Sequence, residues 1–344
     1  MNTSTIQSFK ISFCTTCMNR LYHLKETLPM NLINNSTYKN VEFVVLNYNS
    51  NDEIDLWVEK EMIAEIRSQK LRYIKTLDPM HFKMSHAKNM VTRFANGDII
   101  CNIDADNFTG SGFAEYVNQQ FSKDKNIFLT GGGKDTMGRV CLWKADFLRL
   151  RGYDEKILDW GYEDTDFYYR VNDQIGRTEV KILDFKHLLT IEHDEFERMK
   201  NGIYNSEIEF GLVLETENII KAYVLKKNNK FEYLIITPNS GNSLSGALID
   251  KDKIRCGNWT IKKEHFQFRD DDCENIITFP TNDGGQTYIA PEGVYKKTPK
   301  SKVCFYYSML KGQLAYYENA TFKQDINLNG FGEGLVFEPF AHLI

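Results

Sequence analysis

Residues 98–107 of the chain read Asp-Ile-Ile-Cys-Asn-Ile-Asp-Ala-Asp-Asn. The apolar run from Ile99 to Ile103 predicts a short buried strand, because strands covered on both faces are nearly continuous in apolar residues. The strand ends in two carboxylates, Asp104 and Asp106, which repel each other and lose hydration on burial. A divalent cation with oxygen ligands would compensate both charges. An acidic turn is the alternative, since Asp and Asn also favour turns, and the motif alone leaves both interpretations open.

A second acidic motif lies at residues 159–167, Asp-Trp-Gly-Tyr-Glu-Asp-Thr-Asp-Phe. The Trp-Gly pair predicts a turn, and the apolar spacing after it predicts a helix. Glu163 and Asp164 would lie in the first turn, where the helix dipole stabilises carboxylates. Stabilisation of the helix alone could therefore explain their presence. Dipole stabilisation does not account for the aromatic residues Trp160 and Tyr162 around them. An active site would explain both the acids and the aromatic residues: a carboxylate would act as the general base, and the aromatic rings would pack against a sugar.

The two motifs, in this order and spacing, resemble those of the nucleotide-sugar glycosyltransferases of the GT-A fold. The likeness is to family-2-type members, with the Trp-Gly-x-Glu-Asp motif of the galactosyltransferase branch. It implies a Rossmann-like α/β fold with a mainly parallel central sheet, in which Asp104 and Asp106 hold the metal. It also implies that Asp164 is the catalytic base and that Glu163 binds sugar hydroxyls. Asp166, further along the helix, is expected to tolerate replacement better than Asp164.

Further segments match the same family in order over residues ~9 to 200. The family's Pro-Thr-Tyr-Asn-Arg loop corresponds to residues 15–20, where Asn-Arg matches and Thr-Cys-Met departs. Its uracil-binding aspartate corresponds to Asn47, and an arginine of its Ala-Arg-Asn stretch corresponds to Lys88. The resemblance therefore implies a nucleotide site made of Thr15, Arg20, Asn47, Lys88, Asp104 and Trp160.

His193 ends a later apolar run, residues 188–193. GT-A enzymes often bring a third metal ligand to this place, so the resemblance implies His193 as a ligand with Asp104 and Asp106. Mn²⁺ accepts such a mixture of imidazole and carboxylate better than Mg²⁺, although either ion is compatible with the carboxylates. A core histidine is the alternative interpretation, and His187 is the weaker substitute as a ligand.

Composition limits the classes of function. A net charge of −5 and a pI near 5.9 argue against a nucleic-acid-binding protein, which would carry a basic surplus. No apolar run approaches the ~18 residues of a membrane span, and residues 1–10 are polar. We therefore expect a cytoplasmic protein without a transmembrane segment, and peripheral membrane contact stays open. The seven scattered cysteines are expected to be free thiols. The Cys14-x-x-Cys17 spacing has no second pair to complete a zinc site.

A chain of 344 residues exceeds one typical domain. Strands alternate with helical patterns over about the first hundred residues, whereas short alternating runs dominate after Phe231. We expect a GT-A catalytic domain at residues 1–228 and an all-β accessory domain at residues 229–344. Sugar binding, acceptor positioning and oligomer contact all remain open as its role. The expected strands are Tyr233–Ile236, Thr260–Phe268, Ile276–Phe279, Val303–Leu310, Gln313–Tyr317 and Leu335–Phe340.

The resemblance predicts a metal-dependent, inverting transfer from a UDP-sugar of the galactose or N-acetylgalactosamine type. The acceptor would be a saccharide or glycolipid hydroxyl, in surface polysaccharide synthesis. A nucleotidyltransferase is one alternative, but it would need a basic, glycine-rich phosphate loop, which residues 15–20 do not form. A non-catalytic sugar-binding protein on the same scaffold is the other, although it would have no need to keep both acidic motifs.

Overall fold

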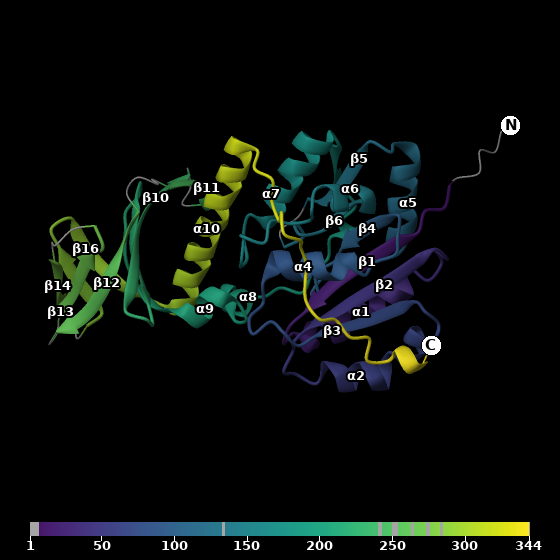
Figure 1. The fold of residues 1–344 in the computed structure, drawn as a ribbon, viewed down its shortest axis with the longest axis horizontal. Coiled ribbons are helices and arrows are strands. Elements are labelled where there is room, and N and C mark those ends of the chain that lie inside the picture. The colour runs from purple at the N-terminus through teal and green to yellow at the C-terminus, as the bar shows by residue number, and fades with distance from the viewer. Residues whose placement is uncertain are drawn as a thin grey trace. The chain divides into compact units, whose positions relative to one another are not determined.

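The structure, a computed structural model, describes residues 7–132, 135–239, 243–249, 254–262, 265–272, 276–282 and 285–343. The chain forms two compact units (Figure 1). The first, here called the α/β unit, comprises Met1–Leu158, Tyr162–His193 and Tyr316–Ile344. The second, the β-rich unit, comprises Asp159–Gly161 and Asp194–Ala315. The chain therefore passes from one unit to the other and back within a few residues of the Trp-Gly-Tyr-Glu-Asp motif.

A seven-stranded sheet in the order β3-β2-β1-β4-β6-β5-β7 forms the centre of the α/β unit. Its strands are β1 (Ile11–Cys17), β2 (Val41–Tyr48), β3 (Leu71–Thr76), β4 (Ile99–Asn102), β5 (Ile127–Gly131), β6 (Val140–Trp143) and β7 (Thr178–Ile182). Only β6 pairs antiparallel to its neighbours, so the mainly parallel sheet expected from the sequence is confirmed. The strand order reverses between β1 and β4, and ligands bind outside the carboxyl ends of strands at such a reversal.

Helices cover both faces of this sheet, because alternate strand residues face opposite ways. Phe13 packs in a cluster with residues of α1 and α5, whereas its neighbour Cys14 packs in a cluster with residues of α4 and α7. The helices are α1 (Leu21–Asn34), α2 (Ile54–Glu61), α3 (Ile63–Arg67), α4 (Met84–Arg93), α5 (Phe113–Lys123), α6 (Lys144–Arg149) and α7 (Glu163–Arg170). A π-helical turn, Val171–Ile175, continues α7, and a 3₁₀ turn spans Phe185–His187.

An antiparallel sheet that closes on itself forms the β-rich unit. β8 pairs with both β9 and β16, and β9 pairs with β10, so the strands run in a ring. Aromatic side chains such as Tyr223, Phe268 and Phe279 pack together within it. The elements are α8 (Glu195–Met199), α9 (Ile203–Glu207), β8 (Ile208–Glu215), β9 (Ile220–Lys226), β10 (Lys230–Asn239), β11 (Ser243–Ile249), β12 (Arg255–Lys262), β13 (His265–Asp270), β14 (Ile276–Asn282), β15 (Thr287–Ala290) and β16 (Gly293–Thr298).

The expected strands at Val303–Leu310 and Gln313–Tyr317 are wrong. Both lie in one helix, α10 (Lys300–Phe322). Val303, Tyr307 and Leu310 recur at helical spacing and pack against apolar residues of β8, β9 and β10. Their β-branched and aromatic types favour strands, and this tertiary packing overrides the local preference. The expected strand Leu335–Phe340 forms only an isolated bridge between Phe337 and Lys75.

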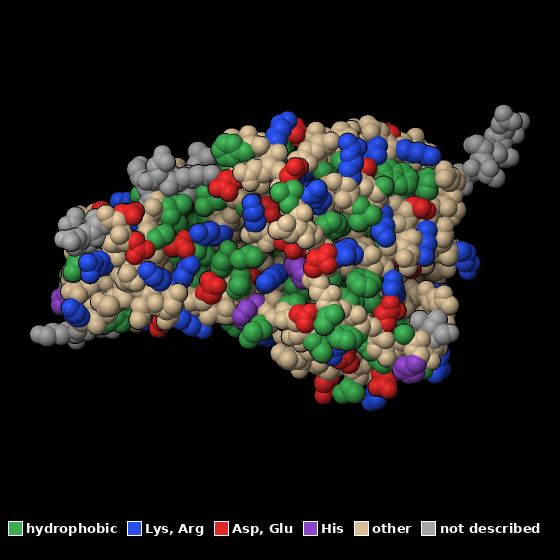
Figure 2. Space-filling view, in the orientation of Figure 1, with side chains coloured by type: hydrophobic (Ala, Val, Ile, Leu, Met, Phe, Trp, Pro, Cys, Tyr) green, Lys and Arg blue, Asp and Glu red, His purple; other side chains and the backbone are tan. Residues whose placement is uncertain are grey.

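The two units also divide the chain differently from the expected boundaries at residues 1–228 and 229–344. Asp194–Ala315 groups in the β-rich unit, and Tyr316–Ile344 returns to the α/β unit. The six described cysteines are free. None of the described helices combines the length and apolar composition that crossing a bilayer requires. On the face shown in Figure 2, acidic and basic side chains are interspersed, as the small net charge would suggest.

Candidate active site

Asp106 and His193 lie together at the carboxyl edge of the sheet. Nε2 of His193 is 2.7 Å from Oδ2 of Asp106, and both side chains are largely buried. The backbone holds the two segments in register, since the amide of Ile191 donates to the carbonyl of Asp106 and Asn107 bridges Thr190. His187, the weaker candidate, instead hydrogen bonds through Nδ1 to the carbonyl of Thr109. The structure thus brings together Asp106 and His193 rather than Asp106 and His187.

Charge around Asp106 favours its ionised form. Burial alone would raise the pKa of this carboxyl, but the hydrogen bond and charge of His193 and the charge of Arg20 hold the pKa below its usual value. Asp104 differs: burial raises its pKa, Asp106 and Glu163 raise it further, and only Lys88 and Asn102 oppose them. Asp104 is therefore the carboxylate of the pair whose charge is less well compensated.

Gly138, in the loop before β6, lies close to both Asp104 and the base motif. A methyl group at position 138 would lie 2.6 Å from Oδ2 of Asp104 and 3.4 Å from Oδ2 of Asp164. Nδ2 of Asn102, the last residue of β4, donates to the carbonyl of Gly138 and to Oδ1 of Asp104. The two acidic motifs, distant in sequence, therefore both lie close to one glycine.

Lys88 holds the two acids of the second motif. Its Nζ lies 2.7 Å from Oδ1 of Asp164 and 3.1 Å from an oxygen of Glu163, and the ammonium group is buried. Burial raises the pKa of Asp164 to about 8; Lys88 lowers it, while Glu163 and Asp104 raise it. The effect of burial on the pKa of this carboxyl therefore outweighs that of the charge of Lys88.

The remaining candidates for the nucleotide site lie at the ends of β1 and β2. Thr15 is buried within β1, and Arg20 precedes α1. Both polar atoms of the Asn47 side chain form hydrogen bonds with nearby residues. Its Nδ2 donates to Asp55, and its Oδ1 accepts from the amide of Ser50. The charge of Arg20 helps to lower the pKa of Asp106, and Lys88 pairs with the base motif.

Trp160 belongs to the β-rich unit. Its ring stacks on Phe305 at 5.0 Å, the guanidinium of Arg198 lies 4.6 Å from the ring centroid, and its carbonyl accepts from Ser308. Its expected contact with a sugar ring stays a prediction. The next turn begins with Gly161 at φ +115° and Tyr162 at φ +68°. A left-handed tyrosine is a strained conformation, and such strain is concentrated at functional sites.

Two polar side chains of α1, Thr27 and Asn31, hold the loop after β4, and the sequence analysis missed them. The hydroxyl of Thr27 donates to the carbonyl of Ala105, and Nδ2 of Asn31 donates to the carbonyl of Asn107. Oδ1 of Asn31 accepts from the amide of Thr109, and all these groups are buried. The i, i+4 spacing of Thr27 and Asn31 was the available signal, but their backbone partners are remote in sequence.

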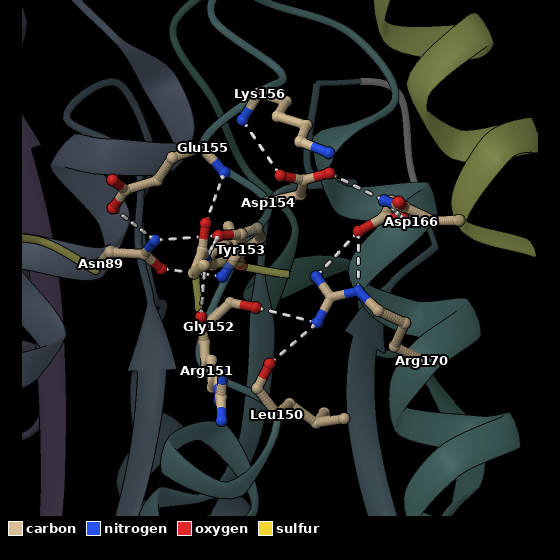
Figure 3. A network of polar contacts seen from close by, with 12 residues as sticks. Asn89, Leu150, Arg151, Gly152, Tyr153, Asp154, Glu155, Lys156, Asp166 and Arg170 are labelled. Carbon is tan, nitrogen blue, oxygen red and sulfur yellow. Dashed lines mark hydrogen bonds and ion pairs between the residues drawn. The ribbon is translucent and has the colours of Figure 1, made fainter. Parts of the chain in front are cut away.

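A second network that the sequence analysis missed fixes α7 (Figure 3). Asp166 is fully buried and pairs with Arg170, whose guanidinium also donates to the carbonyl of Gly152. Nδ2 of Asn319, in α10, donates to both Asp166 and Asp154. Replacing Asp166 would therefore lower stability, because a buried ion pair that loses one partner leaves an uncompensated charge. Its expected tolerance in turnover, relative to Asp164, stays a prediction.

The donors present fit a metal shared with a substrate. Among the described residues, no group of three or more His, Cys, Asp and Glu side chains is arranged as a complete metal site. Asp106 and His193 supply two converging donors, one oxygen and one imidazole nitrogen, which Mn²⁺ accepts together. Within the described ranges of the chain, the expected set of Asp104, Asp106 and His193 therefore does not form a group of three ligands, and Asp106 and His193 are the pair that converges.

Comparison with known proteins relates residues 134–194 to the N-terminal domain of galactosyltransferase, by a match to that family's model. This segment contains Gly138, Glu163, Asp164 and His193. No curated protein gives a significant match to the sequence. The matched segment, together with the parallel sheet and its acidic edge, supports a glycosyltransferase.

Three solved structures illustrate the fold-level likeness. A mannosyltransferase of Pyrobaculum calidifontis, in complex with GDP-Man and Mn²⁺, is 17% identical with a TM-score of 0.44, over 52% of this chain and 56% of its own. The catalytic domain of Drosophila β1,4-galactosyltransferase 7 with xylobiose is 15% identical with a TM-score of 0.39, over 56% and 74%. GalNAc-T7 with UDP, GalNAc and Mn²⁺ is 11% identical with a TM-score of 0.44, over 87% and 81%. The chain thus spans little more than half the length of the mannosyltransferase.

Proposed function

We propose that this chain is a metal-dependent, inverting glycosyltransferase that moves a sugar from a UDP-sugar to an acceptor hydroxyl. The observation that supports the proposal is that Asp104 and Asp164 both lie close to Gly138, as a metal motif and a base that serve one reaction would. The family-model match over residues 134–194 includes the base motif and supports the same class.

Asp106 and His193 would hold the metal, with Asp104 beside them. The bound ion would supply Lewis-acid stabilisation of the charge that develops on the departing nucleotide. The raised pKa of Asp104 is consistent with this role, since burial and the neighbouring charges of Asp106 and Glu163 raise it despite Lys88, and a cation would relieve that cost. Arg20 lies close enough to influence Asp106 electrostatically and would contribute positive charge toward the diphosphate.

Asp164 would accept the proton of the acceptor hydroxyl. Its Oδ1 is held by Lys88, while its Oδ2 lies on the side of Gly138 and Asp104. We therefore assign the proton to Oδ2. A carboxylate whose pKa is raised to about 8 binds a proton more strongly than an ordinary aspartate, and general bases work best with a pKa near the operating pH. Glu163 would orient sugar hydroxyls.

The proposed donor sugar and acceptor rest on the family match alone. A galactose or N-acetylgalactosamine donor is favoured because the matched model describes a galactosyltransferase domain. A saccharide or glycolipid acceptor, and a place in surface polysaccharide synthesis, extend the same proposal. Mg²⁺ is the alternative to Mn²⁺, because hard oxygen ligands suit both ions.

A donor screen tests this function. Purified protein is incubated with each common UDP-sugar and Mn²⁺, and released UDP is measured with and without a chelator. We expect release from one or a few UDP-sugars, abolished by the chelator and by Asp106→Asn. Release that is independent of metal, or no release and no UDP binding with any donor, would contradict the proposal.

A further inference from the structure

The two oxygens of Asp106 have different partners. Oδ2 faces Nε2 of His193 at 2.7 Å, whereas Oδ1 accepts from Nδ2 of the next residue, Asn107, at 3.1 Å. The side chain of Asn107 is fully buried. A carboxylate with one oxygen satisfied in this way has one oxygen left to share with the imidazole.

The orientation of the Asn107 amide is determined by a third residue, Arg139. Nη2 of Arg139 lies 3.1 Å from Oδ1 of Asn107. A guanidinium group has donors and no acceptor, so the amide oxygen must face Arg139 and the amide NH₂ must face Asp106. The carbonyl of Asn107 is held as well, by Asn31. Arg139, Asn107, Asp106 and His193 thus form one continuous relay of hydrogen bonds.

Arg139 is itself buried and held by a backbone carbonyl and an aromatic ring. Nη2 also donates to the carbonyl of Phe108, and the guanidinium lies 5.6 Å from the ring centroid of Phe113. Its Nε and Nη1 have no hydrogen-bond partner in the part of the chain that the structure describes. A buried cation is costly: burial lowers the pKa of Arg139 to about 10, and the charges of Asp104 and Asp106 are among those that oppose this effect.

We infer that Asn107 and Arg139 are positioning residues for the metal. Asn107 occupies Oδ1 of Asp106 so that Oδ2 is presented beside His193, and Arg139 fixes the amide that does so while compensating the carboxylate charge. This inference rests on the metal site of the proposed function but concerns two residues that neither acidic motif includes as ligands. Hydrogen bonds of this kind typically change metal affinity by about 10–100-fold.

The test measures Mn²⁺ binding in the presence of saturating UDP, by the electron paramagnetic resonance signal of free Mn²⁺, on the full chain. Asn107→Ala and Arg139→Met should weaken Mn²⁺ binding about 10–100-fold. Asn118→Ala is the matched control: Asn118 is also a buried asparagine of the α/β unit, bound to the amide of Phe9 and the hydroxyl of Tyr38. It should lose stability and keep wild-type Mn²⁺ affinity.

The outcomes separate the inference from the proposed function. If the wild type binds Mn²⁺ and a folded Asn107→Ala protein binds it equally well, the positioning role is overturned while the metal site stands. If Asn118→Ala weakens Mn²⁺ binding as much as Asn107→Ala does, the effect is general destabilisation and the inference is also overturned. If the wild type binds no Mn²⁺ with UDP, the proposed metal site and the inference fall together. If Arg139→Met does not fold, the Mn²⁺ affinity of Asn107→Ala alone tests the positioning role.

Discussion

The ammonium group of Lys88 lies 2.7 Å from Oδ1 of Asp164 in the interior of the α/β unit. This ion pair joins α4 to the first turn of α7, and Glu163 shares the same cation at 3.1 Å. Lys88 therefore holds the two acids of the base motif, and its expected contact with the nucleotide stays a prediction. Burial alone would lower the pKa of Lys88, but the charges of Asp164 and Glu163 raise it well above its usual value.

Replacing Lys88 by Met should leave two buried carboxylates without a cation. Removing one partner of a buried ion pair typically costs about 3–5 kcal/mol, so the free energy of unfolding in urea should fall by that order. Lys181→Met is the matched control, because Lys181 pairs with Glu179 at the surface and exposed pairs contribute up to about 1 kcal/mol. Equal small losses in the two variants would mean that the Lys88 cluster contributes little to stability.

Gly138→Ala should disrupt the meeting of the two acidic motifs. The added methyl group would lie 2.6 Å from Oδ2 of Asp104, closer than carbon and oxygen approach without displacement. Calorimetric titration with UDP and Mn²⁺ should show clearly weakened binding. Gly132→Ala in the same loop is the control, because its methyl group would meet nothing closer than 3.4 Å. Undiminished binding by Gly138→Ala would show that Asp104 can move aside without loss.

Local patterns in the sequence predicted the parallel sheet and the acidic edge, because each depends on a few consecutive residues. The strand that leads into Asp104 and Asp106 is such a pattern. The helix α10 was missed because its aromatic and β-branched residues have strand preferences that only packing overrides. Arg139 and Asn31 were missed for another reason: each acts on a backbone or amide group far along the chain. Such pairings appear only once the fold brings the segments together.

The lowered pKa of Glu232 should make the stability of the β-rich unit depend on pH. Burial alone would raise the pKa of this carboxyl, but hydrogen bonds from Lys226, Lys311 and Tyr307 and the charge of Lys311 lower it to about 2. A lowered folded-state pKa stabilises the protein above the unfolded value, and this contribution is lost as pH falls through the folded one. A shift of this size corresponds to about 3 kcal/mol.

Glu232→Gln should therefore unfold more readily in urea than the wild type at pH 7, and the difference should narrow between about pH 4.5 and pH 2. Tryptophan fluorescence follows the transition. Glu215→Gln provides the comparison, since Glu215 forms an exposed pair with Lys302 at 3.8 Å, and it should match the wild type at every pH. A Glu232→Gln deficit that stays constant as the pH is lowered would show that lost packing, rather than charge, is responsible.

Asp164→Asn tests the catalytic base. The amide keeps the shape of the side chain and cannot accept the proton, so kcat for sugar transfer or UDP-sugar hydrolysis should fall by about 10²-fold or more. UDP and Mn²⁺ binding should persist, because Asp106 and His193 are untouched. The wild-type rate should rise with pH toward about 8, since burial raises the pKa of Asp164 to about 8 and the base acts only when ionised. The Asn variant should lack this rise.

The control for that experiment is Asp173→Asn rather than Asp166→Asn. Asp166 is buried against Arg170 and Asn319, so its replacement would lower stability and confuse the comparison. Asp173 lies in the π-helical turn after α7 and pairs with Lys323 near the surface, so Asp173→Asn should keep wild-type turnover and pH dependence. Near-normal turnover by Asp164→Asn, with the pH profile unchanged, would place the base on another residue and remove the main support for an inverting mechanism at this site.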